Sequence, residues 1–315
     1  RQSRCRKKKK LAAAIDAGSN TLRLLIGRVV DGRVVPELNR RRNRRLAGNI
    51  TQQEGLSAET KETNHSVFRD FSKICQNSEV EQVRAVGTAA FRQAVNGEYF
   101  ADQGRQTTGL PLEIINGEAE GFYTARGVVS ALDPVPAQAL IFDIGGGSTE
   151  FILCVDGRVV WSRSFSLGVV HLTEAHTSPV ARQAEISKTL TLVRAELQRA
   201  YISSGADLAK LSRVGTAGTV TTLAALDMQM SEYDWRRVNN YSLPYHSLQN
   251  WYERLCPMTP LEREALPGME PGRGDLIIAG LEIVLGIIQA THSERLVVSD
   301  FGILEGMLLS MYEGT

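Results

Sequence analysis

The chain has 315 residues, which is enough for two ordinary domains that each bury an apolar core. Its 43% hydrophobic and 23% charged residues are typical of a folded globular protein, and they exclude extended disorder. The four cysteines and five histidines show neither the spacing of a disulfide framework nor that of a zinc site, so we expect a reduced, cytoplasmic protein.

The net charge of +1 hides two basic clusters near the N-terminus. Residues 1–10, RQSRCRKKKK, are typical of a solvated basic tail, whereas RRRNRR at 40–45 lies within the globular part. Both clusters would attract polyanions. The longest apolar segment, residues 276–290, contains Glu282 and is too short to cross a bilayer, so it predicts a buried helix. We expect no membrane partner and no specific nucleic-acid partner.

Two segments of the chain, the first of them near its start, have similar sequences. Residues 11–35, LAAAIDAGSNTLRLLIGRVVDGRVV, resemble residues 139–161, ALIFDIGGGSTEFILCVDGRVVW. Asp16 matches Asp143, and Gly18 matches Gly145. Both copies contain VDGRVV, whose Asp-Gly pair favours a tight β-hairpin. Each copy therefore predicts a strand, a glycine turn, a strand, a hairpin turn and a third strand.

Helical spacing follows each copy, at 57–76 and at 178–201. A strand and a helix start come next in both halves, and the chain ends in another strand, turn and helix. The pattern predicts two α/β halves that face one another across a cleft. We place the first domain at 11–133, completed by the C-terminal helix at 300–315, and the second at 134–299.

The two glycine turns are candidate phosphate sites. Glycines without a Cβ let backbone N–H groups approach an anion closely, although one such turn could be chosen for its shape alone. The spacing is that of neither a dinucleotide fold nor a P-loop. The candidate phosphate-binding residues are Gly18, Ser19, Asn20, Thr21, Arg23, Thr88, Arg92, Gly145, Gly146, Gly147, Ser148, Thr149, Gly218 and Thr219.

Carboxylates lie beside both turns. Asp143 next to a phosphate cradle suits Mg²⁺, which proteins hold with one or two carboxylates, phosphate oxygens and water. Asp16 and Glu150 are the further candidate metal ligands, and Glu150 could instead orient the attacking water or be a surface acid. Glu118 and Glu120 begin a helix after the strand LEII, where one could point into the cleft or both could be ordinary first-turn acids.

Eight motifs in order resemble those of the exopolyphosphatase and guanosine pentaphosphate phosphohydrolase (Ppx/GppA) family, across residues 11–312. They are AAIDAGSNTLRLLI, VGTAAFRQA, EIINGEAEG, FDIGGGSTEFIL, SLGVVHLTE, VGTAGTVTTLAAL, PGMEPGRGDLIIAG and VVSDFGILEG. The resemblance implies two duplicated ribonuclease-H-like α/β domains, as in the actin, Hsp70 and sugar-kinase superfamily. It also implies a short two-domain member, because the series ends close to the last residue.

The same resemblance implies roles for individual residues. It places Glu120 as the base that activates water, with Glu150 assisting, and Arg92 as a phosphate contact. His171 and Leu304 stand where the family commonly has arginine, which implies less positive charge in the cleft. The family motif around Arg45 is also altered, and reads RRLAGN here.

The leading hypothesis is a Mg²⁺-dependent hydrolase that releases terminal orthophosphate from inorganic polyphosphate, converts pppGpp to ppGpp, or does both. One alternative is an ATP-dependent kinase or actin-like ATPase of the same superfamily, with GTAGT at 215–219 in its nucleotide pocket. Another is a non-catalytic sensor of polyphosphate or of guanosine penta- and tetraphosphate. A homodimer is also an alternative, because exposed apolar helices could supply its contacts.

Overall fold

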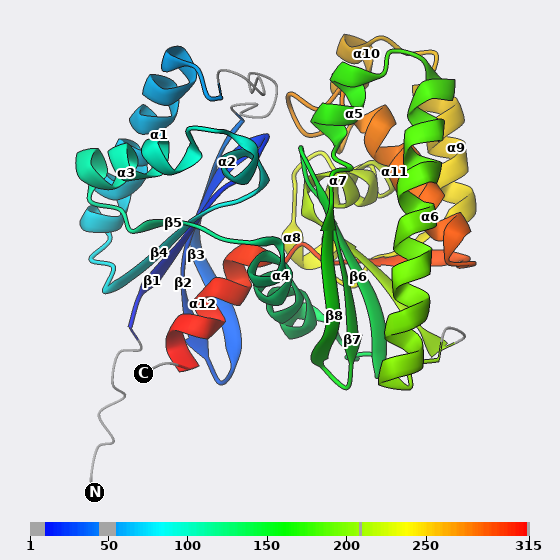
Figure 1. Ribbon diagram of the computed structural model, residues 1–315, viewed down its shortest axis with the longest axis horizontal. Coiled ribbons are helices and arrows are strands. Elements are labelled where there is room, and N and C mark those ends of the chain that lie inside the picture. Colours follow the sequence, from blue (N-terminus) through cyan, green and yellow to red (C-terminus); the bar gives the residue numbers. More distant parts are fainter. Residues whose placement is uncertain (1–9, 44–54, 208–209, 314–315) are drawn as a thin grey trace, which may run out of the picture.

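The computed structural model describes residues 10–43, 55–207 and 210–313. The described chain forms two mixed β-sheets that lie side by side, each with helices against it (Figure 1). The first part of the sequence, coloured blue to cyan, builds one half, and the green to orange part builds the other.

The first sheet has five strands in the order β3-β2-β1-β4-β5. Strands β1 (Ala12–Ala17), β2 (Thr21–Val30) and β3 (Arg33–Asn43) are antiparallel, and β4 (Gln82–Gly87) and β5 (Leu112–Ile114) continue parallel to β1. Helices α1 (Ala58–Asn77), α2 (Ala89–Gln93) and α3 (Gly97–Thr108) share one apolar core with this sheet.

The second sheet repeats that arrangement in the order β10-β11-β9-β6-β7-β8. Its antiparallel part is β6 (Gln138–Ile144), β7 (Thr149–Val155) and β8 (Arg158–Phe165). Strands β9 (Ser212–Thr216) and β11 (Arg295–Val298) run parallel to β6, and β10 (Ser242–Pro244) closes the edge. The remaining helices of this half are α5 (Val169–Ala175), α6 (Pro179–Ser204), α7 (Ala217–Asp227), α8 (Trp235–Val238), α9 (Tyr245–Leu255), α10 (Pro260–Glu264) and α11 (Ile277–Ala290).

The predicted duplication is confirmed down to the hairpin turns. Asp31 and Gly32 have φ of 52° and 76°, and Asp156 and Gly157 have φ of 48° and 73°. Positive φ at both central residues is the geometry that an Asp-Gly turn supplies. Both hairpins also carry a register shift at the same place, between residues 26 and 27 and between residues 153 and 154.

Two helices lie between the sheets, α4 (Gly117–Ala131) and α12 (Ile303–Glu313) (Figure 1). The apolar face of α12 packs on the first sheet, and that of α4 packs on the second. Where the helices cross, a Cβ on Gly306 would lie 1.7 Å from the carbonyl oxygen of Tyr123. Glycine is therefore required there, and the close crossing fixes the first turn of α4 beside both sheets.

The fold-class prediction of two duplicated α/β domains is confirmed, and the C-terminal helix packs on the first sheet. The domain boundary at 133/134 stays a prediction. Residues 1–9 of the predicted basic tail, as well as Arg44 and Arg45, lie outside the described residues. Within the described chain, no helix is long and apolar enough to cross a membrane.

Candidate active site

The two glycine turns face each other at close range. Each turn has the same backbone hydrogen bond, from Gly18 N to Thr21 O at 3.1 Å and from Gly145 N to Ser148 O at 2.9 Å. A Cβ on Gly146 would lie 3.1 Å from the amide nitrogen of Asn20. The sister turns therefore meet across a narrow polar cleft, and glycine is what allows the approach.

Most of the predicted phosphate residues line this cleft together. They are Gly18, Ser19, Asn20, Thr21, Arg23, Thr88, Gly145, Gly146, Gly147, Ser148 and Gly218. The four predicted acids Asp16, Glu120, Asp143 and Glu150 line the same cleft. Residues that are far apart in sequence thus form one site at the ends of the central strands.

Thr149 and Thr219 were also expected at the phosphate site, and the structure does not bring them there. The Thr149 hydroxyl donates to the carbonyl oxygen of Leu167, and the residue is fully buried. Thr219 is 2% exposed and packs against Gly280 of α11. Both threonines therefore contact neighbouring elements, and their part in phosphate binding stays a prediction.

Arg92 lies behind the acids and is not part of the cleft lining. Its Nη1 donates to Glu120 Oε2 at 2.7 Å and to the carbonyl oxygen of Ile115 at 2.9 Å. Its Nη2 is 3.9 Å from Glu150 Oε1. Arg92 therefore joins the two candidate catalytic acids, and its phosphate contact stays a prediction.

Glu150 is held by two serine hydroxyls. Ser148 Oγ and Ser164 Oγ both donate to its Oε1, at 2.8 and 2.6 Å. Only 1% of the residue is exposed, so these hydrogen bonds and nearby Arg92 replace water around a buried acid. Ser148 thus donates to a candidate catalytic acid as well as being part of the turn.

Burial and mutual repulsion raise the pKa values of the acids on the second sheet and on α4. The pKa of Asp143 rises to about 7, mainly through burial and then through the charge of Glu150. Burial and Glu150 also raise the pKa of Glu120 well above its ordinary value, although Arg92 opposes the shift. Burial raises the pKa of Glu150 as well. Such a group of acids would be stabilised by a cation.

The acids fit a magnesium ion held in part by its substrate. Among the described residues, no three Asp, Glu, His or Cys side chains are grouped closely enough to hold a metal by themselves. Mg²⁺ needs only one or two carboxylates when phosphate oxygens and water complete its shell. Asp143 has a raised pKa, and the buried Oδ1 of Asp16 has no hydrogen-bond partner in the described chain. Asp16 Oδ2 accepts from Arg23 at 2.6 and 3.0 Å.

Two further arginines line the cleft, and neither was among the predicted site residues. Arg41 lies on β3 directly opposite Arg23 of β2, and Arg273 lies on the segment before α11. A Cβ on Gly218 would lie 1.7 Å from Arg273 Nη2, so the guanidinium covers the start of α7. Burial lowers the pKa of Arg41 to about 10, which still leaves it charged at neutral pH. In the sequence these two arginines lie in the segments RRRNRR and PGRGD. The segments show positive charge, but they do not show that these side chains face the cleft.

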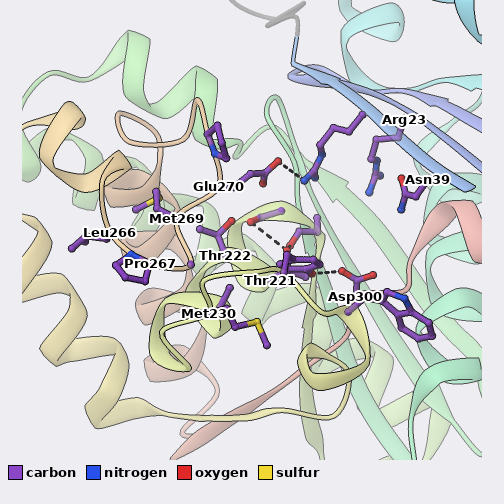
Figure 2. A pocket seen from close by; sticks show the side chains of 18 of the residues that line it. Arg23, Asn39, Thr221, Thr222, Met230, Leu266, Pro267, Met269, Glu270 and Asp300 are labelled. Carbon is purple, nitrogen blue, oxygen red and sulfur yellow. Dashed lines mark hydrogen bonds and ion pairs between the residues drawn. The ribbon is translucent and has the colours of Figure 1, made fainter.

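A larger cavity of about 780 Å³ continues from the cleft and shares Arg23, Arg41, Ala217 and Gly218 with it. Arg23 and Asn39 lie on one side, while Met230, Pro267 and Met269 lie on the opposite side (Figure 2). Further lining residues include Trp235, Leu304, Glu305 and Asp300, the last of which accepts a hydrogen bond from Tyr233. The cavity therefore has an apolar wall, and its lining also includes the buried Glu305 and the half-buried Asp300.

The comparisons with known proteins agree over nearly the whole chain. The model of the Ppx/GppA phosphatase family matches residues 25–314. A Mycobacterium tuberculosis protein named Exopolyphosphatase 2 is 35% identical over 314 residues, which cover 95% of this chain and 98% of that protein. The crystal structure of the Aquifex aeolicus Ppx/GppA family member has 30% identity and a TM-score of 0.80, covering 97% of this chain and 98% of that chain.

A Cytophaga hutchinsonii exopolyphosphatase structure gives a TM-score of 0.86 at 24% identity, over 97% of this chain and 99% of that chain, which supports the fold. Family model, sequence relative and solved structure span the same two domains and the cleft between them. The chain therefore belongs to the Ppx/GppA phosphatase family of hydrolases.

Proposed function

We propose that this protein releases terminal orthophosphate from inorganic polyphosphate. The observation that carries the proposal is the close approach of the two glycine turns beside buried Glu120, Asp143 and Glu150. Turn amides and the arginines suit linked phosphates, and the acids suit the cation and the base that phosphoanhydride hydrolysis needs. The name of the Mycobacterium tuberculosis relative supports the same substrate class.

Glu120 is the proposed base. It is 8% exposed and lines the cleft, and its raised pKa makes its carboxylate a stronger base than that of an ordinary glutamate. Arg92 holds one of its carboxylate oxygens and limits the rise of the pKa. Glu150 lies on the other side of Arg92 and assists by keeping the attacking water oriented.

We propose Mg²⁺ as the cofactor, held by Asp143 with Asp16 and Glu150 as the further candidate ligands. When bound, the ion would neutralise charge that develops on the phosphate oxygens. Ser19, Asn20 and the backbone of Gly146 and Gly147 would hold the terminal phosphate from both sides. Arg23, already oriented by Asp16, would contact the phosphates that follow.

The experiment compares two glutamates on the same helical turn. Phosphate release from long-chain polyphosphate is measured for the wild type, Glu120→Gln and Glu118→Gln. Glu118 is exposed and pairs with Arg163 at 2.9 Å, so its replacement controls for the loss of a charge on α4. We expect E120Q to lose at least ~100-fold in kcat and E118Q to stay within about twofold. Full activity of E120Q would refute the assignment of the base.

A second candidate activity is the conversion of pppGpp to ppGpp, which the large cavity favours. A polyphosphate chain has no apolar group that could pack on the wall of Met230, Pro267 and Met269, whereas a nucleoside would bury its base there. Leu304 lies in this cavity instead of the arginine common in the family. A Met230→Glu variant should lose activity on pppGpp while retaining activity on polyphosphate, and equal losses would argue against a nucleoside site.

A kinase or ATPase is less well supported, because it gives the buried Glu120 beside Arg92 no role. We also propose a cytoplasmic location. Its support is that the three described cysteines, Cys75, Cys154 and Cys256, form no disulfide with one another.

A further inference from the structure

Glu270 lies between two arginines that come from opposite walls of the cleft. Its Oε1 accepts a hydrogen bond from Nη1 of Arg41 on β3, and its Oε2 accepts one from Nε of Arg273. The Glu270 side chain is 19% exposed and that of Arg273 only 7%. Figure 2 shows Glu270 between the apolar wall and the arginine side of the large cavity. One carboxylate thus pairs with two guanidinium groups, one from each half of the molecule.

The segment that carries Glu270 makes a second contact with the same strand. Asn43 Nδ2 donates to the carbonyl oxygen of Pro271 at 3.1 Å, and Thr21 Oγ1 donates to Asn43 Oδ1 at 3.2 Å. Glu270 is therefore held in place and connected to the first glycine turn. Its position between the arginines is part of the large cavity and not a chance surface pairing.

The cleft arginines differ in how they are neutralised. Arg23 has Asp16 as its own counter-ion, whereas Arg41 and Arg273 share Glu270. A phosphate that reaches this pair must compete with a carboxylate that already pairs with both. Orthophosphate would replace the carboxylate with one compact anion, so it would gain little binding free energy. Linked phosphates offer a negative charge on each unit and can engage both arginines while the terminal phosphate occupies the turns.

We propose that Glu270 is a specificity-determining residue, a built-in counter-ion that reserves Arg41 and Arg273 for ligands with several linked phosphates. This inference rests on the proposed polyphosphate substrate. It predicts that the carboxylate disfavours orthophosphate, the product, more strongly than it disfavours a phosphate chain. Selectivity for chains over orthophosphate should therefore fall when its charge is removed.

The test is calorimetric titration of orthophosphate and of tripolyphosphate in EDTA-containing buffer, so that binding is measured without turnover. In Glu270→Gln we expect orthophosphate to bind about tenfold tighter and tripolyphosphate about threefold tighter, because a repelling charge is removed. Glu270→Asp keeps the charge and should resemble the wild type. Glu294 is an exposed acid just before β11, and Glu294→Gln is the control that should change neither affinity.

Weaker binding of both ligands by E270Q would overturn the proposal, since Glu270 would then only organise the arginines. An unchanged ratio of the two affinities would overturn it as well. Should thermal unfolding show that E270Q does not fold, Arg41→Gln provides the test. In that variant Glu270 pairs with Arg273 alone. We expect tripolyphosphate affinity to fall about tenfold and orthophosphate binding to stay unchanged. Equal losses of affinity for the two ligands would refute the inference.

Phosphate release from tripolyphosphate and from long chains, measured with Mg²⁺ on the same samples, separates the two hypotheses. E270Q should lower KM for tripolyphosphate more than for long chains, with kcat within about twofold. A wild type that binds tripolyphosphate and responds to E270Q, but releases no phosphate, would refute the proposed hydrolysis only. Turnover with unchanged selectivity in E270Q would refute the role of Glu270 only.

Discussion

Asp143 faces Glu150 across β6 and β7 at the register position where, in the first half, Asp16 faces Arg23 across β1 and β2. The duplication thus places an ion pair in one half and two buried acids in the other. Both acids of the second pair have raised pKa values, whereas Arg23 neutralises Asp16. The excess of acids over nearby cations therefore lies beside the second glycine turn, which is where we propose the cation.

The first prediction concerns the stability of this acid pair. Burial and Glu150 raise the pKa of Asp143 from 3.8 to about 7, so between these pH values the folded carboxyl keeps a proton that the unfolded one has lost. Folding takes up a proton in this window, and the free energy of unfolding falls as the pH rises through it. Thermal unfolding in EDTA should show a loss on the order of 1–3 kcal/mol from pH 4 to pH 8.

Asp143→Asn should remove most of that loss and be the more stable protein at pH 8, while Asp70→Asn, an exposed acid on α1, should behave like the wild type. Adding Mg²⁺ should stabilise the wild type more at pH 8 than at pH 5, because only the ionised acids attract it. A pH dependence that is the same in D143N and in the wild type would show that other groups cause it.

The second prediction concerns the pH profile of catalysis. Arg92 lowers the pKa of Glu120, although burial and Glu150 raise it overall. In Arg92→Gln the pKa of Glu120 should rise further, so the acidic limb of the kcat/KM profile should move to higher pH, by about one unit. Arg69→Gln removes a half-buried arginine of α1 that pairs with Glu62, and it is the control. A profile of reduced height but unmoved position would mean that Arg92 acts on the substrate instead.

Much of the fold could be predicted from the sequence because the same motif occurs in both halves of the chain. The repeated Asp, glycine turn and VDGRVV hairpin predicted six strands, and all six are present. The helical spacing at 178–201 did the same for α6, where Ser178 accepts a hydrogen bond from Ala181 N and Pro179 is the first helical residue. These signals are local, so a single sequence shows them.

Contacts between the halves were not readable in the same way. Thr149 follows the glycine turn as a phosphate ligand would, yet its hydroxyl bonds a carbonyl 18 residues away. Arg41 and Glu270 are 229 residues apart, and only the packing of the two domains brings them together. Sequence periodicity indicates which face of a strand is buried, but it does not show which partner arrives at that face.

The third prediction concerns Gly218 at the start of α7. A Cβ there would lie 1.7 Å from Arg273 Nη2, the far end of a side chain that can move, so Gly218→Ala should fold and displace the guanidinium. We expect KM for polyphosphate to rise about three- to tenfold, on the scale of one weakened charge contact, with a thermal midpoint within about 2 °C of the wild type. An unchanged KM would place Arg273 outside the substrate path.

The fourth prediction concerns the crossing of α4 and α12. In Gly306→Ala the new methyl group would meet the backbone of Tyr123 at 1.7 Å, and backbone cannot move aside as a side chain can. The helices must separate, which loosens the apolar core that α12 shares with β1 and β2, and we expect a loss of about 2–3 kcal/mol in the free energy of unfolding. Gly104→Ala in α3 is the matched control, because its nearest neighbours would be 3.7 Å away and alanine favours the helix by about 0.5–1 kcal/mol. Urea unfolding should therefore move the two midpoints in opposite directions.

Because α4 also carries Glu120, G306A should lose activity together with stability. A destabilised variant that kept full kcat would show that the position of Glu120 does not depend on this crossing.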